Sequence, residues 1–169
     1  MKRWVFLVVL ILPFLFGACG SSGGGGTPVF TFYSNDTPQV ILDDDFIVSD
    51  ILVTDGPFFI SKVTVTVAIL HTSVSDLVLV LESPDGTVIF LTENDSDGED
   101  FWFTTFDEDA ITGIWETDIL DDPRTGFYLP VDSLDLFYGE DPVGFWTLVV
   151  DDTSVLDDGY LVEWSIDIQ

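Results

Sequence analysis

Residues 77–91 read LVLVLESPDGTVIFL, and this stretch decides the fold class. Leucine alternates with valine over 77–81, which is the two-residue period of a β-strand. The letters SPDG at 83–86 place proline second and glycine fourth, which suits a type I turn. A second apolar run follows at 87–91. The stretch therefore predicts a β-hairpin, and Val78 and Val80 on its second face indicate burial on both sides.

The same alternation recurs on either side of this hairpin. Apolar and polar residues alternate over 62–69 and again over 160–168, whereas helical periodicity is nearly absent. Turns rich in Asp, Gly and Pro separate the runs at 55–57, 139–142 and 157–159. Many short strands joined by such turns predict an all-β chain folded as a β-sandwich.

The first 18 residues have the layout of a secretory signal peptide. Lys2 and Arg3 precede an apolar run, and the small residues Gly17 and Ala18 close it. The run is shorter than the roughly 20 residues that a helix needs to span a bilayer. Cys19 follows directly, and this arrangement resembles the lipobox of bacterial lipoproteins, which implies a diacylglycerol on the thiol. An ordinary signal peptide with a chance cysteine is the alternative.

The segment after the cysteine predicts where the mature chain is held. Residues 19–28 are rich in Gly and Ser and predict a flexible tether, so that residues 29–169 form the folded domain. The lipoprotein resemblance implies attachment to a membrane of the bacterial cell envelope, outside the cytoplasm. Gly20 stands where many inner-membrane lipoproteins carry Asp, which implies the outer membrane in a Gram-negative cell.

The charge of the chain excludes two classes of partner. Lys and Arg number 4 against 31 Asp and Glu, which gives a formal net charge of −27. Nucleic acids and anionic lipids both depend on Lys and Arg contacts, so neither is expected to bind the domain. The same charge attracts cations, although adaptation to a saline habitat is an alternative cause of the acidity.

Calcium is the metal that the acidic residues suggest. Residues 94–100 read NDSDGED, in which alternating carboxylates and a glycine can supply several oxygen ligands from one short loop. The predicted ligands are Asp95, Asp97, Asp100, Asp107 and Asp109. The lone Cys and the lone His exclude a thiol–imidazole cluster. The alternative is a solvated acidic turn with no bound ion.

Several short motifs, in order and in register, resemble the P domain (P/Homo B domain) of proprotein convertases and bacterial subtilisin-like proteases. They are His71-Thr72, Asp76-Leu77, SPDGT at 83–87, TFDEDA at 105–110, GFYLP at 126–130, GFWTL at 144–148, Gly159-Tyr160-Leu161 and Trp164. The resemblance covers about Val40 to Ile168 and implies a jelly-roll β-sandwich of about eight strands. In convertases this module follows a subtilisin-type catalytic domain and stabilises it.

The chain offers no catalytic triad. His71 is the single imidazole, and no serine stands in a Gly-x-Ser-x-Gly elbow. We therefore interpret His71 as a structural histidine and expect no enzymatic activity from this chain.

The sequence analysis thus favours a non-catalytic, membrane-tethered P-domain lipoprotein that supports a subtilisin-like serine endopeptidase in trans. A calcium-dependent carbohydrate-binding module at the cell surface is the alternative, with Trp102 and Trp115 as residues that could stack on a glycan. We expect both of these tryptophans to be tucked under the irregular segment from 94 to 130. Trp146 and Trp164 alternate as core residues do.

Overall fold

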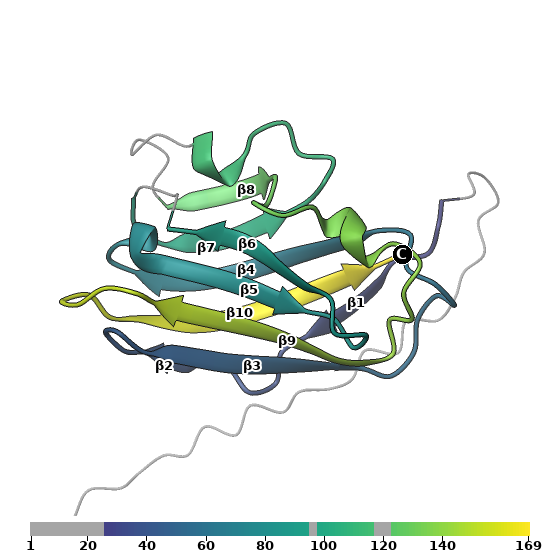
Figure 1. Cartoon of the computed structure of the whole chain (residues 1–169), viewed down its shortest axis with the longest axis horizontal. Coiled ribbons are helices and arrows are strands. Elements are labelled where there is room, and N and C mark those ends of the chain that lie inside the picture. Colours follow the sequence, from purple (N-terminus) through teal and green to yellow (C-terminus); the bar gives the residue numbers. More distant parts are fainter. Residues whose placement is uncertain (1–25, 95–97, 117–122) are drawn as a thin grey trace, which may run out of the picture.

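The structure is a computed structural model that describes residues 26–94, 98–116 and 123–169. Two β-sheets pack face to face, with loops at both ends of the sandwich (Figure 1). The predicted signal peptide, Cys19 and most of the tether lie outside the described residues, as do Asp95 and Asp97. In the described part of the chain, no helix is long and apolar enough to cross a membrane.

Each sheet is an ordered set of strands. Sheet I contains, in order, β1 (Phe30–Tyr33), β10 (Gly159–Ile168), β4 (Val63–His71), β7 (Phe101–Phe106) and β8 (Arg124–Tyr128), and β2 (Gln39–Ile41) also pairs with β10. Sheet II contains β3 (Phe46–Val53), β9 (Gly144–Asp152), β5 (Leu77–Glu82) and β6 (Val88–Glu93). Three short 3-10 helices lie in the connections: η1 (Val74–Asp76), η2 (Ile114–Glu116) and η3 (Leu134–Phe137).

Four antiparallel ladders nest inside one another along the chain. They pair β2 with β10, β3 with β9, β4 with β7, and β5 with β6. One long hairpin wound into two sheets gives this order, which is the winding of a jelly roll. The predicted turn at 83–86 is the tip of that hairpin, where the Gly86 N–H donates to the Ser83 carbonyl oxygen at 2.9 Å. The predicted all-β sandwich is therefore confirmed.

The described residues form ten strands, where the resemblance implies about eight. The short strands β1 and β2 both pair with β10, at its two ends. β8 is a further strand that runs parallel to β7. Its sequence, RTGFY, shows no clear alternation of apolar and polar residues. Gly126 in the middle of the strand has a φ of 101°, a backbone conformation that interrupts a regular strand.

The inner faces of the two sheets form the core. Trp146 and Trp164 are fully buried there, as the alternation predicted. The indole N–H of Trp146 donates to the Pro142 carbonyl oxygen at 3.0 Å, and that of Trp164 donates to the Ser49 hydroxyl at 2.7 Å. Because a buried N–H without an acceptor is costly, these bonds allow both rings to lie in an apolar core.

Candidate functional site

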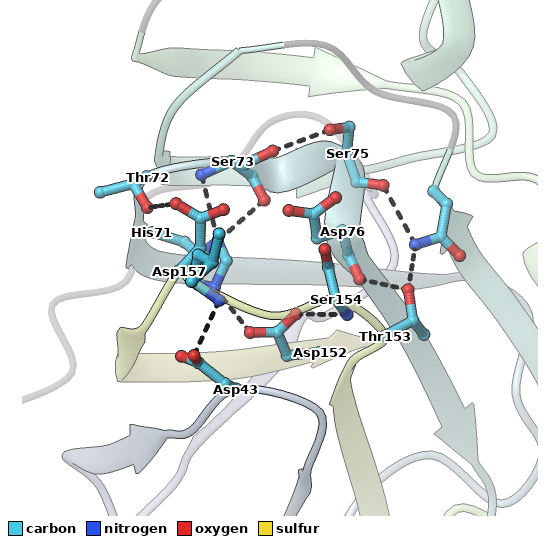
Figure 2. A network of polar contacts seen from close by, with 12 residues as sticks. Asp43, His71, Thr72, Ser73, Ser75, Asp76, Asp152, Thr153, Ser154 and Asp157 are labelled. Atoms are coloured by element: carbon cyan, nitrogen blue, oxygen red, sulfur yellow. Dashed lines mark hydrogen bonds and ion pairs between the residues drawn. The ribbon is translucent and has the colours of Figure 1, made fainter.

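A polar network joins the loops at one end of the sandwich, where β4 and β9 end (Figure 2). His71 is its centre. The Nδ1 atom of its imidazole lies 2.8 Å from the Ser73 carbonyl oxygen, and Nε2 lies 3.3 Å from Oδ2 of Asp152. The side chains of His71 and Asp152 are both 0 % exposed. The histidine therefore cross-links the end of β4 to the end of β9.

Further hydrogen bonds extend the network to the neighbouring loops. Oδ1 of Asp152 accepts from the Ser154 N–H at 3.1 Å. The Thr153 hydroxyl donates to the Asp76 carbonyl oxygen at 2.9 Å and accepts from Nδ2 of Asn94 at 2.8 Å. The network thus holds the connection after β6 and the connection after β9 against η1 (Figure 2).

The contacts of His71 differ from those of the histidine in a serine-protease triad. Both ring nitrogens of His71 face groups other than a serine hydroxyl. The Ser73 hydroxyl instead pairs with the Ser75 hydroxyl, at 2.8 Å. A serine nucleophile must lie within hydrogen-bond reach of its base, and no described serine does so here. The structural interpretation of His71 agrees with this arrangement.

The acidic residues that were predicted to share one ion lie at two ends of β7. Asp100 precedes the strand, where its Oδ1 accepts from the His71 N–H at 2.8 Å. Asp107 and Asp109 follow the strand, and Lys62 binds both carboxylates, at 2.7 Å and 2.5 Å. The six residues of β7 separate the two ends by about 20 Å. One ion bound near Asp100 therefore cannot also be bound by Asp107 and Asp109.

The described residues alone assemble no metal site. Among them, no group of three or more His, Cys, Asp or Glu side chains is arranged to hold an ion. Asp95 and Asp97, which lie outside this part of the chain, were the other predicted ligands of the loop at 94–100. Sequence reasoning did not find the contacts of Lys62, because that residue lies 45 positions before Asp107 and only the β4–β7 pairing brings them together.

The pKa of Lys62 is raised above its ordinary value of 10.5. Partial burial lowers it, but hydrogen bonds to Asp107 and Asp109 and the charges of these carboxylates raise it by more in sum. A raised folded pKa means that the charged lysine stabilises the fold fully below about pH 10.5, and that this contribution is lost as the pH rises through the folded value.

We therefore expect the thermal midpoint to fall as the pH is raised above about 10.5, because Lys62 then loses its charge. Lys62→Arg is the matched variant, since a guanidinium stays charged in that range. Melting curves followed by circular dichroism between pH 8 and 12 measure the thermal midpoints of the wild type and of Lys62→Arg. An equal decline in the two proteins would show that the Lys62 ion pairs do not contribute.

Two tryptophans are more exposed than we predicted. Trp102 is 38 % exposed and Trp115 is 44 % exposed, so neither is tucked under the irregular segment. The ring of Trp115 lies against Gly113, where an added Cβ would come within 2.5 Å of the ring. Trp102 lies beside Phe103 on the outer face of sheet I, with ring centroids 5.2 Å apart.

A row of apolar side chains crosses the outer face of sheet II, next to a polar row formed by Asp50, Thr147 and Glu82. Val48 pairs with Val149, Val149 with Val80, and Val80 with Phe90, so one row of apolar side chains crosses β3, β9, β5 and β6. We define the apolar face by this row and its neighbours: Phe46, Val48, Leu52, Val78, Val80, Val88, Phe90, Phe145 and Val149. Five of these described residues are at least 44 % exposed. The most exposed are Phe46 and Phe145, at 60 % each.

The comparisons with known proteins place this fold in a family. The family model described as "Proprotein convertase P-domain" matches residues 60–168 of the 169. The chain belongs to the P-domain family. The resemblance that the sequence motifs suggested is thereby confirmed. No curated protein sequence matches the chain.

Two solved structures share the fold. The serine protease of Aeromonas sobria in complex with the chaperone ORF2 matches with a TM-score of 0.52 and 22 % identity, over 84 % of this chain and 27 % of that one. A structure of the Aeromonas sobria serine protease matches with a TM-score of 0.51 and 21 % identity, over 86 % of this chain and 28 % of that one. The P-domain chain thus spans little more than a quarter of the length of these protease chains.

Proposed function

We propose that this chain is a non-catalytic, membrane-tethered lipoprotein whose P domain binds and stabilises a subtilisin-like serine endopeptidase in trans. Family membership supports a protease-associated role, since the P domain is a non-catalytic module of proteases. The Aeromonas protease chains that share the fold are nearly four times as long as the matched part. The partner of the domain is therefore expected to be the catalytic part of such an enzyme, on a separate chain.

The observation that carries this proposal is the apolar face. Val78 and Val80 predicted burial on both sides of β5, yet both are only half-buried. On the neighbouring strands of the same face, Val48 is 44 % exposed and Phe145 is 60 % exposed. Apolar side chains of all four strands are thus grouped in one row with a polar row beside it, and an exposed apolar patch rimmed by polar residues marks an interaction site. A protein partner would provide the burial that the sequence pattern calls for.

The edges of sheet II indicate that a partner docks on the face rather than adding a strand. Along β6, the Asp132 N–H donates to the Phe90 carbonyl oxygen at 2.9 Å, and the Asp132 carboxylate accepts from the Phe90 N–H at 2.9 Å. Along β3, the Asp36 carboxylate accepts from the Asp50 N–H at 3.1 Å. Because backbone groups of both edge strands are occupied, strand addition is disfavoured.

The test is a binding titration between the purified chain and a subtilisin-type catalytic domain encoded in the same genome. We expect a 1:1 complex, a raised thermal midpoint of the enzyme by mass action, and no peptide hydrolysis by the P-domain chain alone. Failure to form a complex would contradict the proposed partner. Hydrolysis by the chain that disappears in His71→Ala would contradict the non-catalytic role.

We further propose that calcium bound at the loop of residues 94–100 stabilises the domain, since Asp100 anchors this loop to β4. Adding calcium is expected to raise the thermal midpoint by several degrees, and a chelator to reverse the change. Asp100→Asn should reduce this response. Asp107→Asn should leave it unchanged, because Asp107 lies at the far end of β7. A midpoint that is insensitive to calcium would contradict the site.

A further inference from the structure

The outer face of sheet I carries a cleft of about 330 Å³ between β1 and β7. Tyr33 of β1 stands at one side and Phe103 of β7 at the other, and they are 67 % and 48 % exposed. This volume is at the lower end of the roughly 300–1,000 Å³ that is usual for small-ligand pockets. The cleft therefore has room for a small group between two aromatic walls.

A β-bulge shapes the wall on β7. The pairing with β4 shifts register between Val67 and Ala68, and Phe103 has a φ of 52°. Two consecutive side chains, Trp102 and Phe103, consequently lie on the outer face, which a regular strand does not allow. A bulky residue in this left-handed conformation is strained, and such strain concentrates at functional sites.

A second bulge shapes the wall on β10. The pairing with β4 shifts register between Leu161 and Glu163, and Glu163 is exposed at the cleft. Opposite it in the register lies Ala68 of β4, which also pairs with Trp102. Ala68 is only 1 % exposed, so it forms the base of the cleft between these two larger residues.

The floor of the cleft is polar. The Thr66 hydroxyl pairs with the Thr105 hydroxyl at 2.9 Å, and the Thr31 hydroxyl donates to Oδ1 of Asp167 at 2.5 Å. Ser165 adds a further hydroxyl between these positions. Hydroxyls and carboxylates thus line the floor, while aromatic rings form the sides.

From this arrangement we infer that the cleft binds a neutral carbohydrate, at the scale of one or two sugar rings. The apolar C–H face of a sugar packs on an aromatic ring, and Tyr33 and Phe103 provide such rings in the walls of the cleft. The hydroxyls of the same sugar donate to carboxylates such as Glu163 and Asp167, and exchange hydrogen bonds with the threonines. The two carboxylates and the net charge of −27 disfavour acidic glycans.

This site is separate from the proposed protease contact. The cleft lies on sheet I, and the apolar face lies on the outer side of sheet II. Glycan binding and protease binding can therefore fail or succeed independently, and a variant of the apolar face should leave glycan binding unchanged.

The experiment applies the purified full-length chain to an array of neutral and sialylated glycans, followed by titration calorimetry with the tightest neutral binder. We expect neutral glycans to bind and sialylated ones to be excluded. Tyr33→Ala, Phe103→Ala and Glu163→Gln should each weaken binding at least tenfold. Phe145→Ala is the matched control, since this aromatic ring is 60 % exposed on sheet II, and it should bind as the wild type does.

Tyr33→Ala keeps the test decisive if Phe103→Ala fails to fold, because the largely exposed Tyr33 ring contributes little to the core. Absence of binding to every neutral glycan on the array would overturn the inference. Equal binding by the wild type and folded Tyr33→Ala and Glu163→Gln proteins would also overturn it.

Discussion

Replacing Val149 by aspartate is expected to weaken binding of the proposed protease partner at least 100-fold. Val149 lies at the centre of the apolar face, paired with Val48 on one side and Val80 on the other. A partner seated on this face would bury the new carboxylate without an ion pair. A 100-fold loss corresponds to about 2.7 kcal/mol, which is within the usual cost of burying an unpaired polar group. Titration calorimetry with the catalytic domain measures the change.

Phe127→Asp is the matched control for this variant. Phe127 is a 66 % exposed aromatic residue on sheet I, so the substitution adds the same charge away from the apolar face. We expect it to bind the partner as the wild type does. Melting curves establish that both variants are folded. Unchanged binding by a folded Val149→Asp protein would show that the partner docks elsewhere.

Removing the carboxylate of Asp152 is expected to destabilise the domain by about 1–3 kcal/mol. The Asp152 side chain is fully buried, and its two oxygens contact the Nε2 of His71 and the Ser154 N–H. Asp152→Ala leaves the buried His71 ring and the half-buried Ser154 N–H without this acceptor, and an unsatisfied buried group carries its full desolvation penalty. Chemical denaturation measures the free energy of unfolding.

Asp151→Ala is the control for this prediction. It removes the neighbouring carboxylate, which lies on the outer face of sheet II, on the opposite side of β9 from Asp152. We expect a change within about 0.5 kcal/mol, as is usual for surface substitutions. A similar small loss in Asp152→Ala would mean that the His71–Asp152 contact does not hold the ends of β4 and β9 together.

Much of the fold follows from local patterns along the chain. The hairpin at 77–91 and the alternation over 160–168 predict β5, β6 and β10, because a two-residue period is a property of each strand by itself. β1 and β2 were not predicted because they are short, and β7 and β8 were not predicted because they lie in the irregular segment from 94 to 130. The nested order of the ladders depends on contacts between distant residues, which came from the family resemblance alone.

The candidate sites were less accessible to sequence reasoning. The proposed joint role of Asp100, Asp107 and Asp109 failed geometrically, because a strand lies between the first and the other two. Residues that flank the two ends of a strand are close in sequence but far apart in space. The cleft on sheet I depends on two β-bulges, and a bulge leaves no periodic signal. The apolar face did leave one, since Val78 and Val80 alternate with the leucines of β5.

Maleimide labelling of Val149→Cys in living cells tests the central claim most directly. The chain has one native cysteine, Cys19, so a lipid on its thiol would leave position 149 as the labelling site. Phe58→Cys is the control, at a position that is 85 % exposed in the loop between β3 and β4. We predict that position 149 is labelled slowly in cells that contain the protease. It should be labelled fast in the purified protein and in cells from which the protease gene has been deleted. Position 58 should be labelled fast in every case. Equally fast labelling at 149 in cells with and without the protease would contradict a partner on the apolar face.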